Sequence, residues 1–335
     1  MKFAVLGAGR IGKIHAETLV QRLPETEVTA IADPFKAAAD ETAARLRIPL
    51  SSDDASAVIR RDDVEAVAIC SSTDTHVQYI IEAAQAGKHI FCEKPIDMNL
   101  ARIDEALAAV AAAGVKLQIG FNRRFDANFA RVRHAIEQGE IGTPHLIHII
   151  SRDPGPPPIS YVRVSGGMMI DMTIHDFDMA RFLIGSEVEE IYAVAKVRVD
   201  PAIGEAGDVD TALGVLKFAN GVIGTIDNSR KAVYGYDQRV EVFGSGGKIE
   251  SDNNYPNSAF VSTSQLVYRD LPLNFFLERY KESYVTEMQA FVDAIRTGGP
   301  VPVSGEDGRV PVVMAKAARL SIDLDRPVKL SEITA

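Results

Sequence analysis

The chain opens with a short apolar run that leads directly into a glycine-rich turn. Phe3 to Leu6 is typical of a strand buried on both faces, and Gly7-Ala8-Gly9-Arg10-Ile11-Gly12 follows it at once. Apolar residues then recur at helical spacing, so the glycines lie where a strand turns into a helix. A first glycine permits the tight turn, a second lets the backbone approach a pyrophosphate, and a third lets the helix pack closely on the sheet. The pattern predicts a dinucleotide-binding loop whose cofactor contacts are Gly7, Gly9, Arg10, Ile11 and Gly12.

A carboxylate ends the second apolar run. Val28 to Ala32 leads into Asp33, about 20 residues beyond the last glycine. A carboxylate here accepts hydrogen bonds from the adenosine ribose hydroxyls and repels a 2′-phosphate, which favours NAD over NADP. The alternative is that Asp33 caps the next helix, with Pro34 at its first position. Lys36 is the nearby cation that could weaken the preference for NAD.

Composition narrows the class of protein. A chain of 335 residues is long enough for two domains, and a net charge of -10 without a basic run argues against nucleic acid or anionic membrane as a partner. The sequence holds no apolar span of roughly 18 residues, and three glycines and Arg10 interrupt any signal-peptide core. Two cysteines and scattered histidines predict free thiols and no metal site. We expect a cytoplasmic protein that acts on small molecules.

Strands and helices alternate from Met1 to about Ile119. Such alternation predicts parallel strands joined by right-handed crossovers, and hence a doubly wound Rossmann domain over residues 1–119. The cofactor of such a sheet binds beyond the carboxyl ends of its strands.

The pattern changes after residue 119. Long strand-like runs follow, with a hairpin signal at Asn220-Gly221 and a turn at Gly246-Gly247. They predict a C-terminal α+β domain over residues 120–335, built on a mostly antiparallel open sheet that binds substrate and supports oligomerisation. The C-terminal helix is expected to pack back on the first domain.

Hydroxyl groups follow the strand-like run that ends at Cys70. The segment Ser71-Ser72-Thr73-Asp74-Thr75-His76 then begins a helix. One interpretation is that Thr73 or Asp74 caps this helix, which does not exclude contact with a ligand. We expect cofactor contacts from Ser71, Ser72, Thr73 and His76.

The turn Glu93-Lys94-Pro95 follows the next strand. Pro95 restricts Lys94 to an extended backbone, which fixes the direction of the ammonium group. The charged form of a lysine beside a nicotinamide cation is disfavoured, and this suits proton exchange with a substrate hydroxyl. The alternative is an exposed lysine in a turn. We expect Glu93 and Lys94 to contact the cofactor.

Three titratable residues share a predicted helix over residues 168–184. Asp171, His175 and Asp178 have the spacing i, i+4 and i+7, which places them on one stripe. A carboxylate against an imidazole orients the ring and raises its basicity, as a general base for an alcohol requires. The alternative is an acid in the first turn of a helix and a core histidine.

The glycine loop, the E-K-P turn and the G-G-x-x-x-D-x-x-x-H-D-x-D segment together resemble the glucose-fructose oxidoreductase and inositol dehydrogenase family, over nearly the whole chain. In that family the lysine of E-K-P and the Asp and His of the D-x-x-x-H helix form the catalytic set. The resemblance therefore implies that Lys94, Asp171 and His175 are catalytic and contact the substrate.

Two further stretches resemble the inositol dehydrogenase branch: Gly120-Phe121-Asn122-Arg123-Arg124-Phe125-Asp126 and Tyr234-Gly235-Tyr236-Asp237. They imply substrate contacts from Asn122, Arg123, Asp178 and Tyr236. Asn122 stands where methionine is frequent in those enzymes, which leaves the substrate isomer open. The register between Arg123 and Arg124 also stays open.

The activity implied by the resemblance is NAD-dependent oxidation of a secondary alcohol on a cyclic polyol, from myo-inositol to 2-keto-myo-inositol. The alternatives are an aldose or other sugar dehydrogenase of the same family and a non-catalytic NAD-binding regulator. The resemblance also implies a homo-oligomer, with a tetramer favoured.

Overall fold

The computed structural model describes residues 1–334, which form two compact units. The first unit comprises residues 1–122 and 282–310, and the second comprises residues 123–281 and 311–334. The sequence prediction assigns everything after residue 119 to one domain, whereas residues 282–310 pack with the N-terminal part of the chain.

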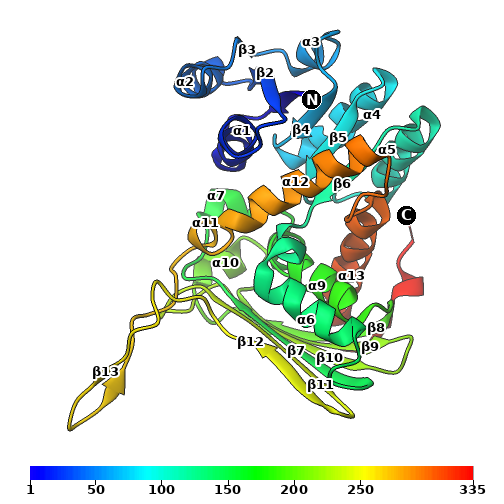
Figure 1. The fold of residues 1–335 in the computed structure, drawn as a ribbon. Helices are drawn as coiled ribbons and strands as arrows, with labels where there is room; N and C mark the ends of the chain where they lie inside the picture. Colours follow the sequence, from blue (N-terminus) through cyan, green and yellow to red (C-terminus); the bar gives the residue numbers. More distant parts are fainter. Residues whose placement is uncertain (335) are drawn as a thin grey trace. The chain divides into compact units, whose positions relative to one another are not determined.

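The first unit is built on a six-stranded parallel sheet with the strand order β3-β2-β1-β4-β5-β6 (Figure 1). Its strands are β1 (Lys2–Leu6), β2 (Glu27–Ala32), β3 (Leu50–Ser52), β4 (Ala66–Ile69), β5 (His89–Glu93) and β6 (Leu117–Gly120). The helices between them are α1 (Arg10–Gln21), α2 (Lys36–Leu46), α3 (Ala55–Ile59), α4 (Thr73–Gln85) and α5 (Leu100–Ala113). The predicted doubly wound Rossmann fold is confirmed.

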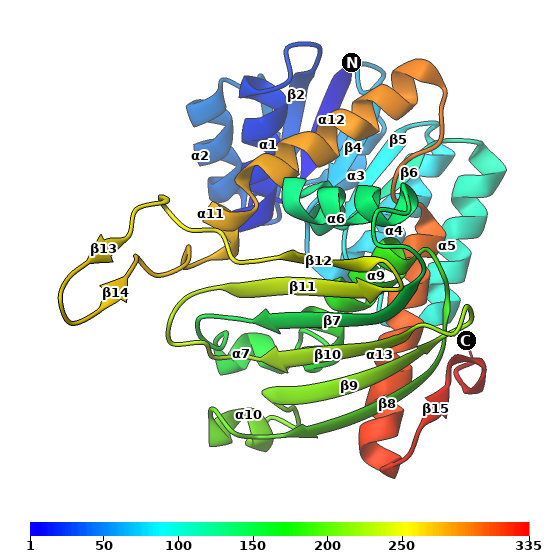
Figure 2. The ribbon, with the colours of Figure 1, turned by 60° about the horizontal axis from the view of Figure 1, so that its bottom comes forward.

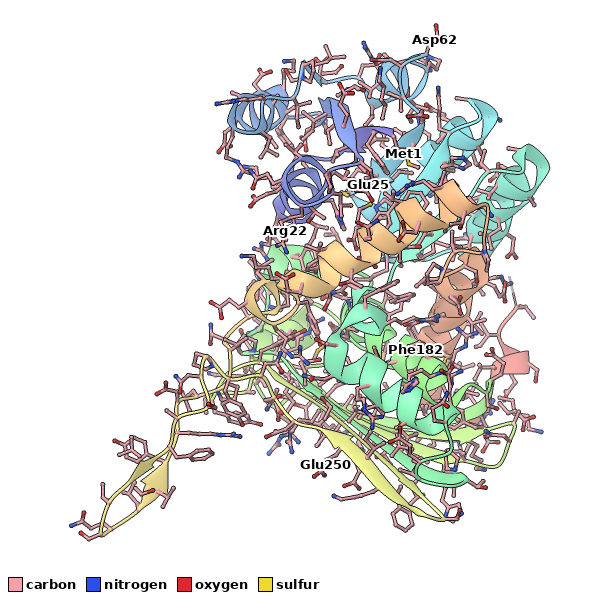
Figure 3. All side chains as sticks on the ribbon, in the orientation of Figure 1. Met1, Arg22, Glu25, Asp62, Phe182 and Glu250 are labelled. Atoms are coloured by element: carbon pink, nitrogen blue, oxygen red, sulfur yellow. The ribbon has the colours of Figure 1, made fainter. Side chains whose placement is uncertain are left out.

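A segment from near the C-terminus completes the core of this unit. In α12 (Lys281–Thr297), Met288, Phe291 and Val292 are fully buried in the same cluster as Phe3. Arg22, labelled in Figure 3, pairs with Glu282 on α12, with 2.9 Å between Nη2 and Oε2. The apolar face of α12 explains why the chain returns to the first unit, since leaving it in water would be costly.

The second unit is built on a seven-stranded sheet with the order β12-β11-β7-β10-β9-β8-β15, seen face-on in Figure 2. Only β7 and β10 pair in parallel, so the predicted mostly antiparallel sheet is confirmed. The strands are β7 (Pro144–Arg152), β8 (Val188–Lys196), β9 (Thr211–Phe218), β10 (Ile223–Ser229), β11 (Asp237–Gly244), β12 (Gly247–Ser251) and β15 (Val328–Lys329).

Helices cover one face of this sheet. Both α6 (Ala127–Glu137) and α9 (Ile174–Ile184) pack on it, and in α13 (Gly305–Leu324) the Ser321 hydroxyl oxygen accepts a hydrogen bond from the Ala193 N–H of β8 at 2.9 Å. The shorter helices are η1 (Asn122–Phe125), α7 (Ile159–Val162), α8 (Gly167–Asp171), α10 (Pro201–Glu205), α11 (Phe276–Arg279) and η2 (Leu330–Glu332). None of the described helices is long and apolar enough to cross a bilayer.

The other face of the sheet carries exposed apolar side chains. Their exposed fractions lie between 43% and 47%, and pairing of neighbouring strands places them on the same side: Val194, Leu213, Ile223 and Phe243. An arm formed by β13 (Val261–Ser262) and β14 (Val267–Tyr268) extends from the same unit (Figures 1 and 2). Its side chains are also exposed, as at Phe260 and Val267.

Candidate active site

The glycine loop has the geometry that its sequence predicts. Gly7 has φ +107°, and a Cβ there would lie 2.4 Å from the Cys70 carbonyl oxygen. A Cβ on Gly12 would lie 1.9 Å from the carbonyl oxygen of Gly7, whereas a Cβ on Gly9 would meet no atom within 4 Å. Side chains are therefore excluded at Gly7 and Gly12, and open space remains beside Gly9. A pyrophosphate at the start of α1 needs this arrangement.

Asp33 is joined to the glycine loop. Its Oδ2 accepts a hydrogen bond from the Ala8 N–H at 2.7 Å, and its Oδ1 accepts one from the Phe35 N–H at 2.8 Å. The next helix begins at Lys36 with Phe35 at the N-cap, so Pro34 is not its first residue and the capping interpretation of Asp33 is not observed. Lys36 forms an ion pair with Asp40.

The segment after β4 does not cap its helix as the alternative interpretation expects. Ser72 occupies the N-cap of α4, its side chain makes no capping hydrogen bond, and the residue is exposed. The Ser71 hydroxyl lies 2.7 Å from that of Thr75. His76 is buried, with Nδ1 2.8 Å from the Pro95 carbonyl oxygen and Nε2 3.1 Å from that of Ser71. The imidazole thus links the ends of β4 and β5.

The E-K-P turn contacts a buried histidine whose role was not predicted from the sequence. Glu93 Oε1 lies 2.7 Å from Nε2 of the fully buried His15. The Glu93 carboxylate packs against Gly120, where an added Cβ would lie 3.0 Å from it. This contact fixes the end of β5, and the half-buried Lys94 follows directly.

The predicted helix over residues 168–184 is broken, so the single stripe expected for three of its residues is wrong. α8 ends at Asp171, Met172 and Thr173 interrupt it, and α9 begins at Ile174. Asp171 therefore ends one helix, whereas His175 lies in the first turn of the next. The break carries no glycine or proline, which is why the sequence pattern does not reveal it.

The Asp171 carboxylate is held by groups distant in sequence. Its Oδ1 accepts a hydrogen bond from the Tyr161 hydroxyl at 2.9 Å, and its Oδ2 lies 3.1 Å from Nη1 of the buried Arg230. His175 is half-buried, at the start of α9.

The two arginines of η1 have different partners. Arg123 Nη1 lies 2.6 Å from Oδ1 of the fully buried Asp176, and its Nη2 lies 3.5 Å from the Tyr236 hydroxyl oxygen. Arg124 Nε instead donates to both oxygens of Asp178, at 2.9 and 3.1 Å. Within the second unit, Arg123 is thus the arginine that meets Tyr236, while Asp178 belongs with Arg124. Asp176 was not identified from the sequence.

Asn122 carries an unsatisfied donor. The residue is 4% exposed, and its side-chain nitrogen is buried without a hydrogen-bond partner among residues 1–334. A buried amide left in this state usually has a ligand or ordered water as its partner.

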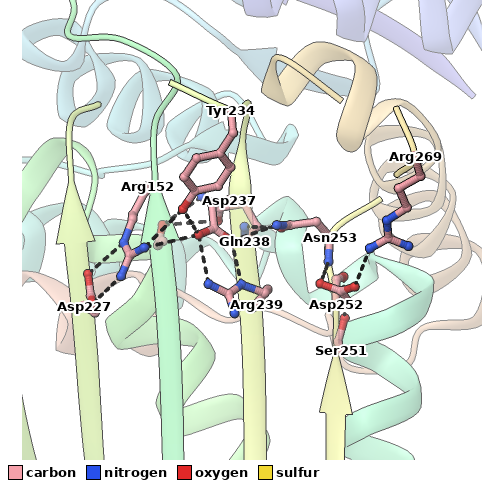
Figure 4. Close-up of polar contacts among 11 residues, drawn as sticks. Arg152, Asp227, Tyr234, Asp237, Gln238, Arg239, Ser251, Asp252, Asn253 and Arg269 are labelled. Atoms are coloured by element: carbon pink, nitrogen blue, oxygen red, sulfur yellow. Dashed lines mark hydrogen bonds and ion pairs between the residues drawn. The ribbon is translucent and has the colours of Figure 1, made fainter. Parts of the chain in front are cut away.

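The G-Y-D segment is anchored by a polar network at the strand ends, drawn in Figure 4. The Tyr234 hydroxyl donates to Asp237 Oδ2 at 2.6 Å and accepts from Arg152 at 3.1 Å. Asn253 donates to Asp237 Oδ1 at 2.8 Å. The network fixes the backbone on both sides of Tyr236.

Asp153, directly after β7, is a carboxylate that the sequence analysis missed. Its side chain makes no hydrogen bond or ion pair with any residue that the structure describes. Burial raises its pKa to about 6, against the opposing effect of Arg123 and Arg230. No signal in the sequence separates this aspartate from the proline-rich loop around it.

Comparison with known proteins assigns the chain to a family. Residues 1–121 match the oxidoreductase family with an NAD-binding Rossmann fold, and residues 129–250 match the GFO/IDH/MocA C-terminal domain. The chain belongs to the GFO/IDH/MocA oxidoreductase family. The predicted family resemblance, oxidoreductase class and NAD cofactor are therefore confirmed.

Named members of the GFO/IDH/MocA family match the chain over its full length. It is 48% identical over 333 residues to myo-inositol 2-dehydrogenase of Thermotoga maritima, covering 99% of each chain. It is 44% identical to inositol 2-dehydrogenase of Rhizobium meliloti, also over 99% of each. The crystal structure of scyllo-inositol dehydrogenase from Lactobacillus casei, with bound NAD(H) and scyllo-inositol, has a TM-score of 0.93, 28% identity and 99% coverage of both chains.

Among residues 1–334, no group of three or more His, Cys, Asp or Glu side chains is placed to hold a metal ion.

The raised pKa of Asp153 predicts a pH dependence of stability. The folded value of about 6 exceeds the unfolded value of about 3.9, so between these values the folded protein holds a proton that the unfolded chain has released. Relative to D153N, the free energy of unfolding of the wild type should fall by at most about 3 kcal/mol as the pH rises through this window, and stay level above it.

Urea denaturation at a series of pH values from 4 to 8 measures this difference. D62N is the control, because it makes the same change of residue type at an exposed carboxylate of the first unit (Figure 3). A constant difference between wild type and D153N would contradict the assignment.

Proposed function

We propose that the protein is an inositol 2-dehydrogenase, which oxidises the secondary alcohol of myo-inositol to 2-keto-myo-inositol with NAD in the catabolism of the polyol. The observation that carries the proposal is 48% identity along the full chain to a myo-inositol 2-dehydrogenase. The presence of Lys94, Asp171 and His175 supports it, because these are the residue types that alcohol oxidation requires.

The geometry of the first unit fits NAD. Open space beside Gly9 suits the pyrophosphate, and Asp33 is available for the ribose because each of its oxygens retains a lone pair. When bound, NAD supplies the acceptor for hydride. We assign cofactor contacts to Gly7, Gly9, Arg10, Ile11, Gly12, Asp33, Ser71, Ser72, Thr73, Glu93 and Lys94, with His76 supporting the ends of two strands.

An uncharged polyol must be recognised by hydrogen bonds. Arg123 and Tyr236 present donors beside each other, and the unsatisfied amide of Asn122 offers one more. Buried polar groups left unpaired by the wrong sugar would penalise its binding. We therefore propose substrate contacts from Asn122, Arg123 and Tyr236. Contact from Asp178 stays a prediction, since Arg124 holds its carboxylate.

Three residues carry the proton chemistry in this proposal. His175 removes the hydroxyl proton of the substrate, and Asp171 stabilises the imidazolium that forms. Lys94 donates a hydrogen bond to the reacting oxygen as charge develops there.

We further infer a homotetramer that acts in the cytoplasm. The apolar face of the open sheet supports association, because exposed side chains such as Leu213 and Ile223 gather on it. Both cysteines are free thiols, in keeping with a reducing compartment.

A panel of polyols and sugars tests the activity. We expect the purified protein to reduce NAD fastest with myo-inositol, compared with scyllo-inositol, glucose and xylose. NADP should be used roughly a hundredfold less efficiently because Asp33 repels the 2′-phosphate. H175A should lose about 100- to 10,000-fold in turnover while its NAD affinity, measured by calorimetry, is unchanged.

Any other result of the panel would assign a different function to the protein. Turnover of aldoses without turnover of inositols would identify a sugar dehydrogenase. NAD binding without turnover of any substrate would identify a regulator, and full activity of H175A would remove His175 as the base.

The open sheet gives a separate prediction about assembly. Light scattering should find the wild type as a tetramer and L213D/I223D as a smaller species, because charges on an apolar interface oppose its burial. L324D, at an exposed residue that ends α13, is the control. A monomeric wild type, or an L213D/I223D variant of unchanged mass, would contradict the inference.

A further inference from the structure

A buried guanidinium lies against Asp171, outside the residues that the proposed function assigns. We propose that Arg230 is a positioning residue for the reaction: it fixes the position and direction of the Asp171 carboxylate, and so affects turnover more than substrate binding. The inference rests on the proposed function, because it presumes that Asp171 and His175 act on the substrate.

Arg230 is placed directly after β10, with its side chain 1% exposed. Its Nη1 lies 3.1 Å from Asp171 Oδ2, and its Nη2 lies 3.5 Å from Asp208 Oδ2. Its buried Nε has no hydrogen-bond partner among residues 1–334. A guanidinium removed from water to this extent depends on the neighbouring carboxylates for its stability.

Asp208 ties Arg230 to the short helix that ends at Asp171. Both oxygens of Asp208 accept a hydrogen bond from the Met168 N–H, at 3.0 and 3.1 Å. A Cβ on Gly167, which has φ +77°, would lie 2.8 Å from Asp208 Oδ1, so the close approach requires glycine. Asp208 thus holds the first turn of α8 and Arg230 together, while Arg230 holds the last residue of the helix.

The contacts that Arg230 and Asp208 make with α8 matter because this helix has only five residues. A helix of this length is not stable by its own hydrogen bonds, so its end is positioned by what surrounds it. Arg230 and Asp208 fix its two ends, and Tyr161 of α7 fixes the second oxygen of Asp171. The carboxylate therefore has a defined direction before any substrate arrives.

The test compares R230M and R230K with the wild-type protein. R131M is the matched control, because Arg131 is an exposed arginine of the same unit that pairs with Glu140. For each variant, kcat and KM for myo-inositol are measured, together with Tm and NAD affinity. A purely structural role would lower Tm and leave the kcat of the folded enzyme in place.

We expect R230M to lose about 100-fold in kcat, with KM within about threefold of wild type, because the transition state is affected more than binding. R230K keeps the charge but not the planar, two-pronged geometry of the guanidinium, so it should recover part of the activity and lose about tenfold in kcat. R131M should behave as wild type.

A wild-type kcat in R230M would overturn the inference, as would a change in Tm alone. If R230M does not fold, R230K decides, and an unchanged kcat in that variant would overturn the inference. An active wild type with unaffected Arg230 variants would leave the proposed function standing. A wild type without activity on any polyol would overturn both.

Discussion

A charge that leaves water must be compensated inside the protein, and the second unit is organised by this requirement. Four of its arginines, with side chains at most 9% exposed, each meet a carboxylate from a distant part of the chain, in the pairs Arg123–Asp176, Arg124–Asp178, Arg230–Asp171 and Arg279–Asp126. Removing one partner from such a pair leaves an uncompensated ion, which is strongly destabilising. The pairs therefore fix the ends of α8, α9 and η1, where the proposed substrate contacts lie.

The first unit must meet a different requirement, since its backbone has to approach a phosphate closely. Gly7 and Gly12 leave no room for a side chain, and Asp33 is bonded to the same loop. Buried histidines then join the neighbouring strand ends, with His76 between β4 and β5 and His15 beneath Glu93. The loop and the turn that carries Lys94 are thus parts of one rigid framework within the unit.

Features that depend on local pattern could be predicted from the sequence. The buried strands, the glycine loop and the Asn220-Gly221 hairpin follow from periodicity and turn chemistry, and each is present. β3 was missed because Leu50–Ser52 is short, polar and only half-buried. The break before α9 has no local signal, and the partners of Arg124 and Arg230 are distant in sequence, which one sequence does not display. Resemblance to a family supplied the proposed catalytic residues, while tertiary contacts show which groups hold the Asp171 carboxylate.

We propose that Lys94, Asp171 and His175 act on one hydroxyl group of the substrate. A crystal structure of the protein with NADH and myo-inositol bound measures this directly. We expect the Lys94 ammonium and the His175 imidazole to lie within hydrogen-bonding distance, about 3 Å, of the same inositol oxygen, with its carbon facing the nicotinamide. An inositol whose reacting oxygen contacts neither residue would contradict it.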